Sequence, residues 1–247
     1  MKISGSGHID GGKIEDDLIV SGSARIKDSF ECNNLHASGS LNGPGGFIVH
    51  GDIRSSGSFH IGGSLQGDDD AKFSGSASIG QEINVKGKID TSGSFRAGDN
   101  VYALSGLTSS GSMRITGDIF SEKEINLMGS ARVSGNIQGE DVFIGSRSYS
   151  LGKRVFGKKF YPFRIYGGIK AKKNVELLRA RVVGNIVGRN VKIDEYCYIK
   201  GNISYVDTIE IHPKAKVFMK PVQISEEELD RIELELNKDN SKVVKME

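Results

Sequence analysis

Catalysis and metal binding need histidine, cysteine or carboxylate side chains at defined spacings, so these residues are considered first. The sequence has five histidines: His8, His36, His50, His60 and His212. None has a neighbour at the spacing of a catalytic or metal-binding motif, and we expect them to be isolated, solvent-facing side chains. The acidic run Asp68-Asp69-Asp70 lacks the Asp-x-Asp-x-Asp-Gly frame of a calcium loop, so we expect it to be a solvated corner.

Two further kinds of chemistry find no support in the sequence. No Gly-x4-Gly-Lys-Ser/Thr loop occurs, so nucleotide-driven activity is not indicated. Cys32 and Cys197 are too few for a disulfide scaffold, and we interpret both as small core residues in a reducing compartment. We therefore predict a protein that is not an enzyme and has no cofactor, catalytic residue or metal site.

Charge is uneven along the chain although the net charge is only +2. Residues 146–220 carry 17 basic and 5 acidic side chains, a net charge of +12. We predict a basic surface patch for a membrane or a partner: Arg147, Lys153, Arg154, Lys158, Lys159 and Arg164. An anionic membrane surface or an acidic protein client fits this patch. Nucleic acid is not an expected partner, because no reading motif accompanies the charge.

The elements that would position these residues follow from an internal repeat. Ser-Gly-Ser recurs with its glycine at nearly constant intervals, and Met128 replaces the first serine in the last copy. The glycines are Gly5, Gly22, Gly39, Gly57, Gly75, Gly93, Gly111 and Gly129. A fixed period of about 20 residues is typical of a solenoid and not of a flexible linker.

Apolar residues follow each of these glycines in pairs. After Gly75, for example, come Ala77 and Ile79, then Ile83 and Val85. A spacing of two within a pair is typical of a strand with one buried face, and the pairs themselves recur at every sixth position. Three short strands and three corners thus form each coil. The sequence predicts an all-β fold: a parallel, triangular β-helix with about 18 residues per coil.

Breaks in the period divide the chain into four predicted parts. Residues 1–145 form a β-helix of about eight coils, 146–163 a basic, aromatic insertion or hinge, and 164–222 a second β-helix. Residues 223–247 form an acidic tail that is part helix and part disordered. Ser225 and Glu228 have the spacing of a capping box, which predicts the start of a short α-helix.

Several short motifs resemble those of bactofilins, the bacterial polymer-forming cytoskeletal family. They are Gly-Asn-Ile-Val-Gly-Arg-Asn-Val-Lys-Ile at 184–193, Lys-Gly-Asn-Ile at 200–203, Gly-Asn-Ile at 135–137 and Ile-Glu-Ile…Ala-Lys-Val-Phe at 209–218. The chain is most similar to the long two-block variants of Bacillus-like bacteria. The resemblance implies a right-handed β-helix that joins end to end without nucleotide and scaffolds partners in the cell envelope, cell shape or motility.

The ends of such a rod are the predicted functional sites. Exposed strand edges favour pairing, and apolar residues lie near both ends: Ile3 and Ile9 at one, Val217 and Phe218 at the other. We expect self-association into a homo-oligomer or filament. Two alternatives stay open: a left-handed hexapeptide-repeat acyltransferase, and a capped, non-polymerising adaptor that binds a membrane or an acidic partner.

The expected compartment is the cytoplasm. The sequence contains no run of about 18 apolar residues and no apolar signal region after Met1. Peripheral contact with the inner face of the cell membrane, through the basic patch, is an open alternative.

Overall fold

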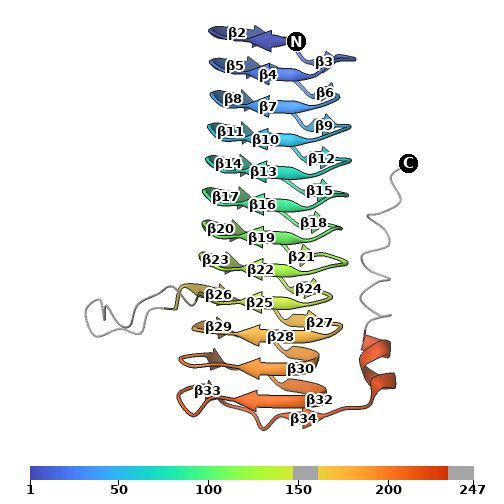
Figure 1. The fold of residues 1–247 in the computed structure, drawn as a ribbon, viewed down its shortest axis with the longest axis vertical. Helices are drawn as coiled ribbons and strands as arrows, with labels where there is room; N and C mark the ends of the chain where they lie inside the picture. The colour runs from blue at the N-terminus through green and yellow to red at the C-terminus, as the bar shows by residue number, and fades with distance from the viewer. Residues whose placement is uncertain (147–160, 233–247) are drawn as a thin grey trace, which may run out of the picture.

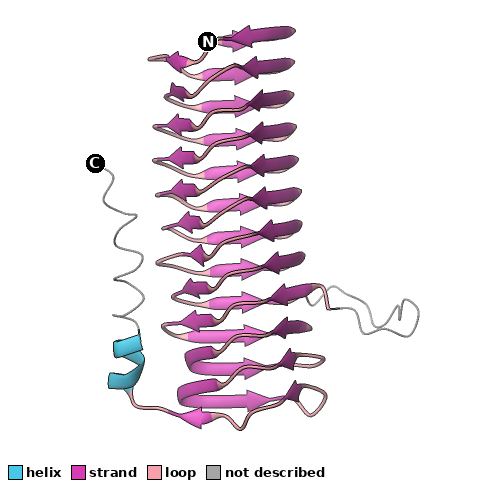
Figure 2. Cartoon of the chain, turned by 180° about the vertical axis from the view of Figure 1, so that it is seen from behind, coloured by secondary structure: helices cyan, strands magenta, loops and turns pink. Residues whose placement is uncertain are grey.

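The computed structural model describes residues 1–146 and 161–232 (Figure 1). These residues form a parallel β-solenoid of about 12 turns with about 18 residues per turn, and one short helix near the C-terminus. The fold predicted from the repeat is thereby confirmed. Each coil has three sides, and the coils stack along one straight axis (Figures 1 and 2).

Sheet B forms one side of the solenoid and takes one strand from each coil. Its strands are β2 (Ser6–Ile9), β5 (Ser23–Ile26), β8 (Ser40–Gly43), β11 (Ser58–Ile61), β14 (Ser76–Ile79), β17 (Ser94–Ala97), β20 (Ser112–Ile115), β23 (Ser130–Val133), β26 (Phe163–Ile165), β29 (Ala180–Val182), β31 (Tyr198–Ile199) and β33 (Lys216–Val217).

Sheet A forms the other two sides. Its first side contains β3 (Gly12–Lys13), β6 (Phe30–Cys32), β9 (Phe47–Val49), β12 (Leu65–Gly67), β15 (Ile83–Val85), β18 (Val101–Ala103), β21 (Ile119–Phe120), β24 (Ile137–Gly139), β27 (Ile169–Ala171) and β34 (Val222–Gln223). Its second side contains β1 (Lys2–Ile3), β4 (Leu18–Val20), β7 (Leu35–Ala37), β10 (Ile53–Ser55), β13 (Ala71–Phe73), β16 (Ile89–Thr91), β19 (Leu107–Ser109), β22 (Ile125–Leu127), β25 (Val142–Ile144) and β28 (Asn174–Leu177). Two longer strands, β30 (Ile186–Ile193) and β32 (Ile203–Ile211), run along both sides.

The core follows from the alternation within each strand. In β14 the inward residues Ala77 and Ile79 are buried, whereas Ser76 beside them is exposed. Large rings stack along the axis, and Phe59, Phe73 and Phe95 have successive centroid distances of 5.6 and 5.4 Å. Burial of apolar surface in this continuous core is the main stabilising contribution.

The repeated glycine is required by close packing between coils. An added Cβ at Gly93 would lie well under 3.0 Å from the carbonyl oxygen of Gly75 in the preceding coil. An added Cβ at Gly111 would be equally close to the carbonyl oxygen of Gly93. Positive φ among the described glycines is confined to Gly11, Gly12 and Gly106, which are outside this series. Crowding against the next coil, and not an unusual dihedral angle, therefore explains the Ser-Gly-Ser corner.

The stack is continuous on either side of residues 147–160. Strand β23 pairs directly with β26, β24 with β27, and β25 with β28. At one corner the Asn136 side-chain Oδ1 accepts a hydrogen bond from the backbone N–H of Gly168, at 2.8 Å. Phe163, which the sequence analysis placed in the insertion, begins β26 and is fully buried. Most of the predicted insertion lies outside the described residues, and the four-part division stays a prediction.

The C-terminal helix begins as the capping box predicts. Glu228 donates its backbone N–H to Ser225 Oγ at 3.2 Å, and Ser225 donates its own to Glu228 Oε2 at 3.1 Å. The helix covers residues 226–232 of the described chain. The rest of the predicted acidic tail, from residue 233, lies outside the described residues.

Candidate functional site

The C-terminal end of the solenoid exposes an apolar surface. Phe218 is 57% exposed, Met219 52% and Val222 56%, and Val217 is half-buried. Among the described strands, β33 pairs only with β31 and β34 only with β32, so their outer edges have backbone groups without a strand partner. Such an edge is a template for another strand.

The N-terminal end also has open strand edges, but its two predicted apolar residues are less exposed. Ile3 is half-buried and Ile9 is 7% exposed. Strands β1, β2 and β3 pair with β4, β5 and β6 on their inner edges, and no described strand covers their outer edges. The four residues predicted from sequence thus lie in the first and last coils.

The described part of the C-terminal helix lies beside the last coils and not across the end of the stack (Figures 1 and 2). Glu226 forms an ion pair with Arg189, which lies midway along β30 at the corner between the two sides of sheet A. Leu229 of this helix is buried. This placement leaves Phe218 and Met219 uncovered by residues 226–232.

The structure describes one residue of the predicted basic patch. Arg164 lies in β26, and its side chain points outward from sheet B. The other five, Arg147, Lys153, Arg154, Lys158 and Lys159, lie outside the described residues. Two aromatic residues next to this segment are placed: Tyr161 packs on Tyr198, with ring centroids 6.0 Å apart, and Tyr166 is exposed.

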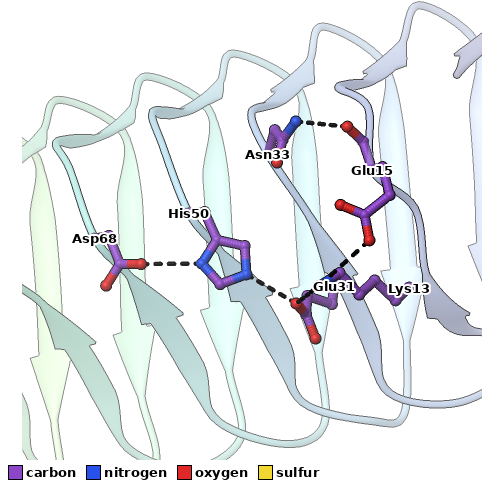
Figure 3. A network of polar contacts seen from close by, with 6 residues as sticks. All are labelled: Lys13, Glu15, Glu31, Asn33, His50 and Asp68. Atoms are coloured by element: carbon purple, nitrogen blue, oxygen red, sulfur yellow. Dashed lines mark hydrogen bonds and ion pairs between the residues drawn. The ribbon is translucent and has the colours of Figure 1, made fainter. Parts of the chain in front are cut away.

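A row of alternating charge crosses the first side of sheet A near the N-terminus (Figure 3). His50 Nε2 lies 2.8 Å from Glu31 Oε1, and His50 Nδ1 lies 3.1 Å from Asp68 Oδ2. Lys13 contacts Glu31 at 3.1 Å, and Lys86 contacts Asp68 at 2.8 Å. Basic and acidic side chains therefore alternate from β3 to β15. The expectation that His50 is an isolated surface side chain was therefore wrong.

These contacts shift the titration of the three central groups. The hydrogen bond that His50 donates to Glu31, followed by the one that it donates to Asp68, raises the pKa of His50 above its ordinary value. The hydrogen bond with His50 holds the pKa of Glu31 below its usual range. The hydrogen bond with Lys86 is the largest cause that lowers the pKa of Asp68. The arrangement favours a protonated imidazole between two carboxylates, which is suited to joining neighbouring coils.

The repeat itself carries a signal for most of this row. His50 lies 18 residues before Asp68, and Lys86 follows Asp68 at the same spacing, so equivalent corners place them on adjacent coils. Glu31 lies 19 residues before His50 and reaches it diagonally, because Glu31 itself is in register with Ile48. Reading acidic and basic residues at the period of the coil finds both contacts of Asp68 and the Lys13–Glu31 pair, but not the contact between Glu31 and His50.

The two cysteines are core residues, as predicted. Cys32 and Cys197 are free and buried. Burial raises the pKa of the Cys32 thiol to about 11 and that of Cys197 to about 12. Both are therefore protonated at neutral pH, which disfavours nucleophilic or metal-binding thiolate chemistry.

Within residues 1–146 and 161–232, no group of three or more histidine, cysteine or carboxylate side chains is placed to hold a metal ion. Among the helices of this described part, none is long and apolar enough to cross a membrane.

The fold and its ends define a class: a parallel β-solenoid with exposed strand edges in its first and last coils. Comparisons with protein-family models, with curated proteins and with solved structures gave no match for this chain.

Proposed function

We propose that this chain is a non-enzymatic scaffold protein, similar to bactofilins, that self-assembles through the ends of its β-solenoid without nucleotide. The assembled rods would hold partners of the cell envelope, of cell shape or of motility at fixed positions. We place this activity in the cytoplasm. The basic segment that contains Lys158 and Lys159 would contact an anionic membrane surface or an acidic client.

One observation carries the proposal: the last coil combines an unpaired strand edge with exposed apolar side chains. Phe218, Met219 and Val222 are each more than half exposed. Repeat proteins that stay monomeric normally cover a terminal repeat with a polar cap. Pairing with another copy would bury these side chains and satisfy the free N–H and C=O groups of β33 and β34.

Analytical ultracentrifugation over a wide range of protein concentration tests the proposal. We expect the sedimentation coefficient of the wild-type chain to rise with concentration. Phe218→Arg should keep the chain monomeric, because a charge would be buried at the contact. Ile3→Arg tests the other end, but Ile3 also packs on the core, so its folding must be checked by circular dichroism.

Ile48→Arg is the matched control, since Ile48 is an exposed apolar residue on β9, away from both end coils. It should assemble like the wild-type chain. A wild-type chain that stays monomeric at high concentration contradicts the proposal and favours the capped adaptor. Saturable binding of acetyl coenzyme A would instead favour the acyltransferase alternative.

A further inference from the structure

Sheet B carries a row of five arginines on its outer face, which we call the arginine row. It consists of Arg96, Arg114, Arg132, Arg164 and Arg181, on strands β17, β20, β23, β26 and β29. These residues are direct neighbours in the strand register. All five side chains are exposed. At about 4.8 Å per strand, the row is roughly 19 Å long.

The arginine row has no negative charge beside it on the sheet. The sheet B strands from β17 to β33 contain no aspartate or glutamate. Among the described residues, none of the five arginines has an ion pair with a carboxylate. Like charges on directly opposed strand positions repel each other. An external anion that bridges neighbouring guanidinium groups would relieve this repulsion.

Neighbouring side chains orient the guanidinium groups and add other contacts. Arg132 lies over the ring of Tyr166 and Arg181 over that of Tyr198, both at 5.3 Å from the ring centroid. Beyond Arg181, the register continues with Tyr198 on β31 and Lys216 on β33. On the other flank, a parallel row of hydroxyl donors comes from Ser94, Ser112 and Ser130.

The shape of this surface restricts the ligand. The charge is one residue wide and straight, which fits a linear polyanion better than a membrane plane. Two hollows on the described surface lie away from this face: Met1 and Ile19 line one, and Ile19 and Lys72 line the other, and none of these residues is on sheet B. A rigid DNA duplex would wind away from a straight row, whereas a flexible single strand can follow it. Guanidinium groups bind phosphates in a bidentate manner, and exposed aromatic rings offer stacking surfaces for bases.

We propose that the outer face of sheet B binds single-stranded nucleic acid along the arginine row. The arginines and serine hydroxyls contact the phosphates, and the exposed ring of Tyr166 stacks with a base. Nucleic acid was not expected from the sequence, because no reading motif accompanies the basic residues. Arg96, Arg114 and Arg132 follow the regular period of the coil, whereas Arg164 and Arg181 join them only through the strand register after residues 147–160.

Fluorescence anisotropy with a labelled oligodeoxythymidylate of about 20 nucleotides tests the proposal with the full chain. Five phosphate contacts predict a slope of about −3.5 in log K against log salt, which is about a 100-fold loss of affinity between about 50 and 200 mM salt. Arg114→Gln with Arg132→Gln should reduce the slope to about −2 and weaken binding about 25-fold at about 0.1 M salt.

Two control variants have the same change in net charge. The first is Arg25→Gln with Lys72→Gln. Lys72 lies on sheet A. Arg25 lies on sheet B in the same register as the arginine row, but three strands without arginine or lysine at that position, β8, β11 and β14, separate it from the row. Lys158→Gln with Lys159→Gln removes charge from the basic patch. The first control should change the affinity by less than about threefold, because remote charges are screened. A change below about threefold in the second control would show that the arginine row, and not the basic patch, binds the strand.

Each other outcome overturns the proposal. These outcomes are no binding of the oligonucleotide at low salt, equal binding by the row variant, or a loss only in the Lys158 and Lys159 variant. Poly-glutamate and vesicles with anionic lipid serve as competing probes. Preferential binding of either through the row would identify an acidic polypeptide or a membrane as the ligand instead. Assembly in the centrifuge is a separate measurement, so the failure of one proposal leaves the other intact.

Discussion

His50 lies between two carboxylates that belong to neighbouring coils. Glu31 and Asp68 bind it most strongly when the imidazole carries a proton, which is why folding raises its pKa. A group whose pKa is raised by folding gives its full stabilisation below its unfolded pKa and loses it as the pH rises through the folded pKa. The two carboxylates, whose pKa values are lowered, lose their contribution in acid.

The His50→Gln variant should therefore be destabilised in a restricted pH range. The loss relative to wild type should be greatest between about pH 4.5 and about pH 6.5, and it should decline above the raised pKa of His50. Urea unfolding at about pH 5.5 and about pH 9 measures the difference.

His60→Gln is the control for this experiment, because His60 is exposed on β11 of sheet B, away from the charged row. It should show no such pH-dependent loss. If the penalty of His50→Gln were the same at both pH values, the ion pairs would not be the source of its stability.

At the level of the coil, the corner glycine permits the spacing of the stack. A methyl group at Gly93 would meet the carbonyl oxygens of both Gly75 and Ser74. Backbone atoms at this corner are held by hydrogen bonds, such as Ser94 N–H to the carbonyl of Gly75 at 3.1 Å. The coils would have to separate locally, and the hydrogen bonds on both sides would lengthen.

Gly93→Ala should therefore destabilise the solenoid by about 1–3 kcal/mol, as overpacking of a tight interior does. Ser92→Ala, at the adjacent exposed position, should change the free energy of unfolding by less than about 0.5 kcal/mol. Equilibrium urea unfolding followed by circular dichroism measures both. Equal stabilities would show that the close approach at the corner is not a constraint.

At the scale of the whole molecule, the stack fixes an axial dimension. About 12 coils at about 4.8 Å correspond to a rod roughly 58 Å long. If assembly joins unlike ends, filaments should have an axial repeat of about 58 Å. If it joins like ends, the repeat should be about 115 Å. Negative-stain electron microscopy distinguishes these values, and filaments with a repeat unrelated to either length would exclude stacking through the ends.

Much of this architecture could be predicted from sequence because a solenoid repeats its local pattern. The spacing of Ala77, Ile79, Ile83 and Val85 determined which side chains point inward, and the capping box located the start of the C-terminal helix. Features that depend on contacts between coils were missed. The arginine row continues after residues 147–160, where the 18-residue period of the sequence is interrupted. Glu31 contacts His50 although the two residues are not opposite each other in the strand register.

The pairing of β23 with β26 has a consequence for length. Because each coil pairs only with the coils next to it, and β23, β24 and β25 pair directly with β26, β27 and β28, whole turns are interchangeable units. A relative that gained or lost complete turns would have the same terminal coils and the same three-sided cross-section. The length of the rod would then change in steps of about 4.8 Å, one step for each turn, and this length would set the distance between partners bound at its two ends.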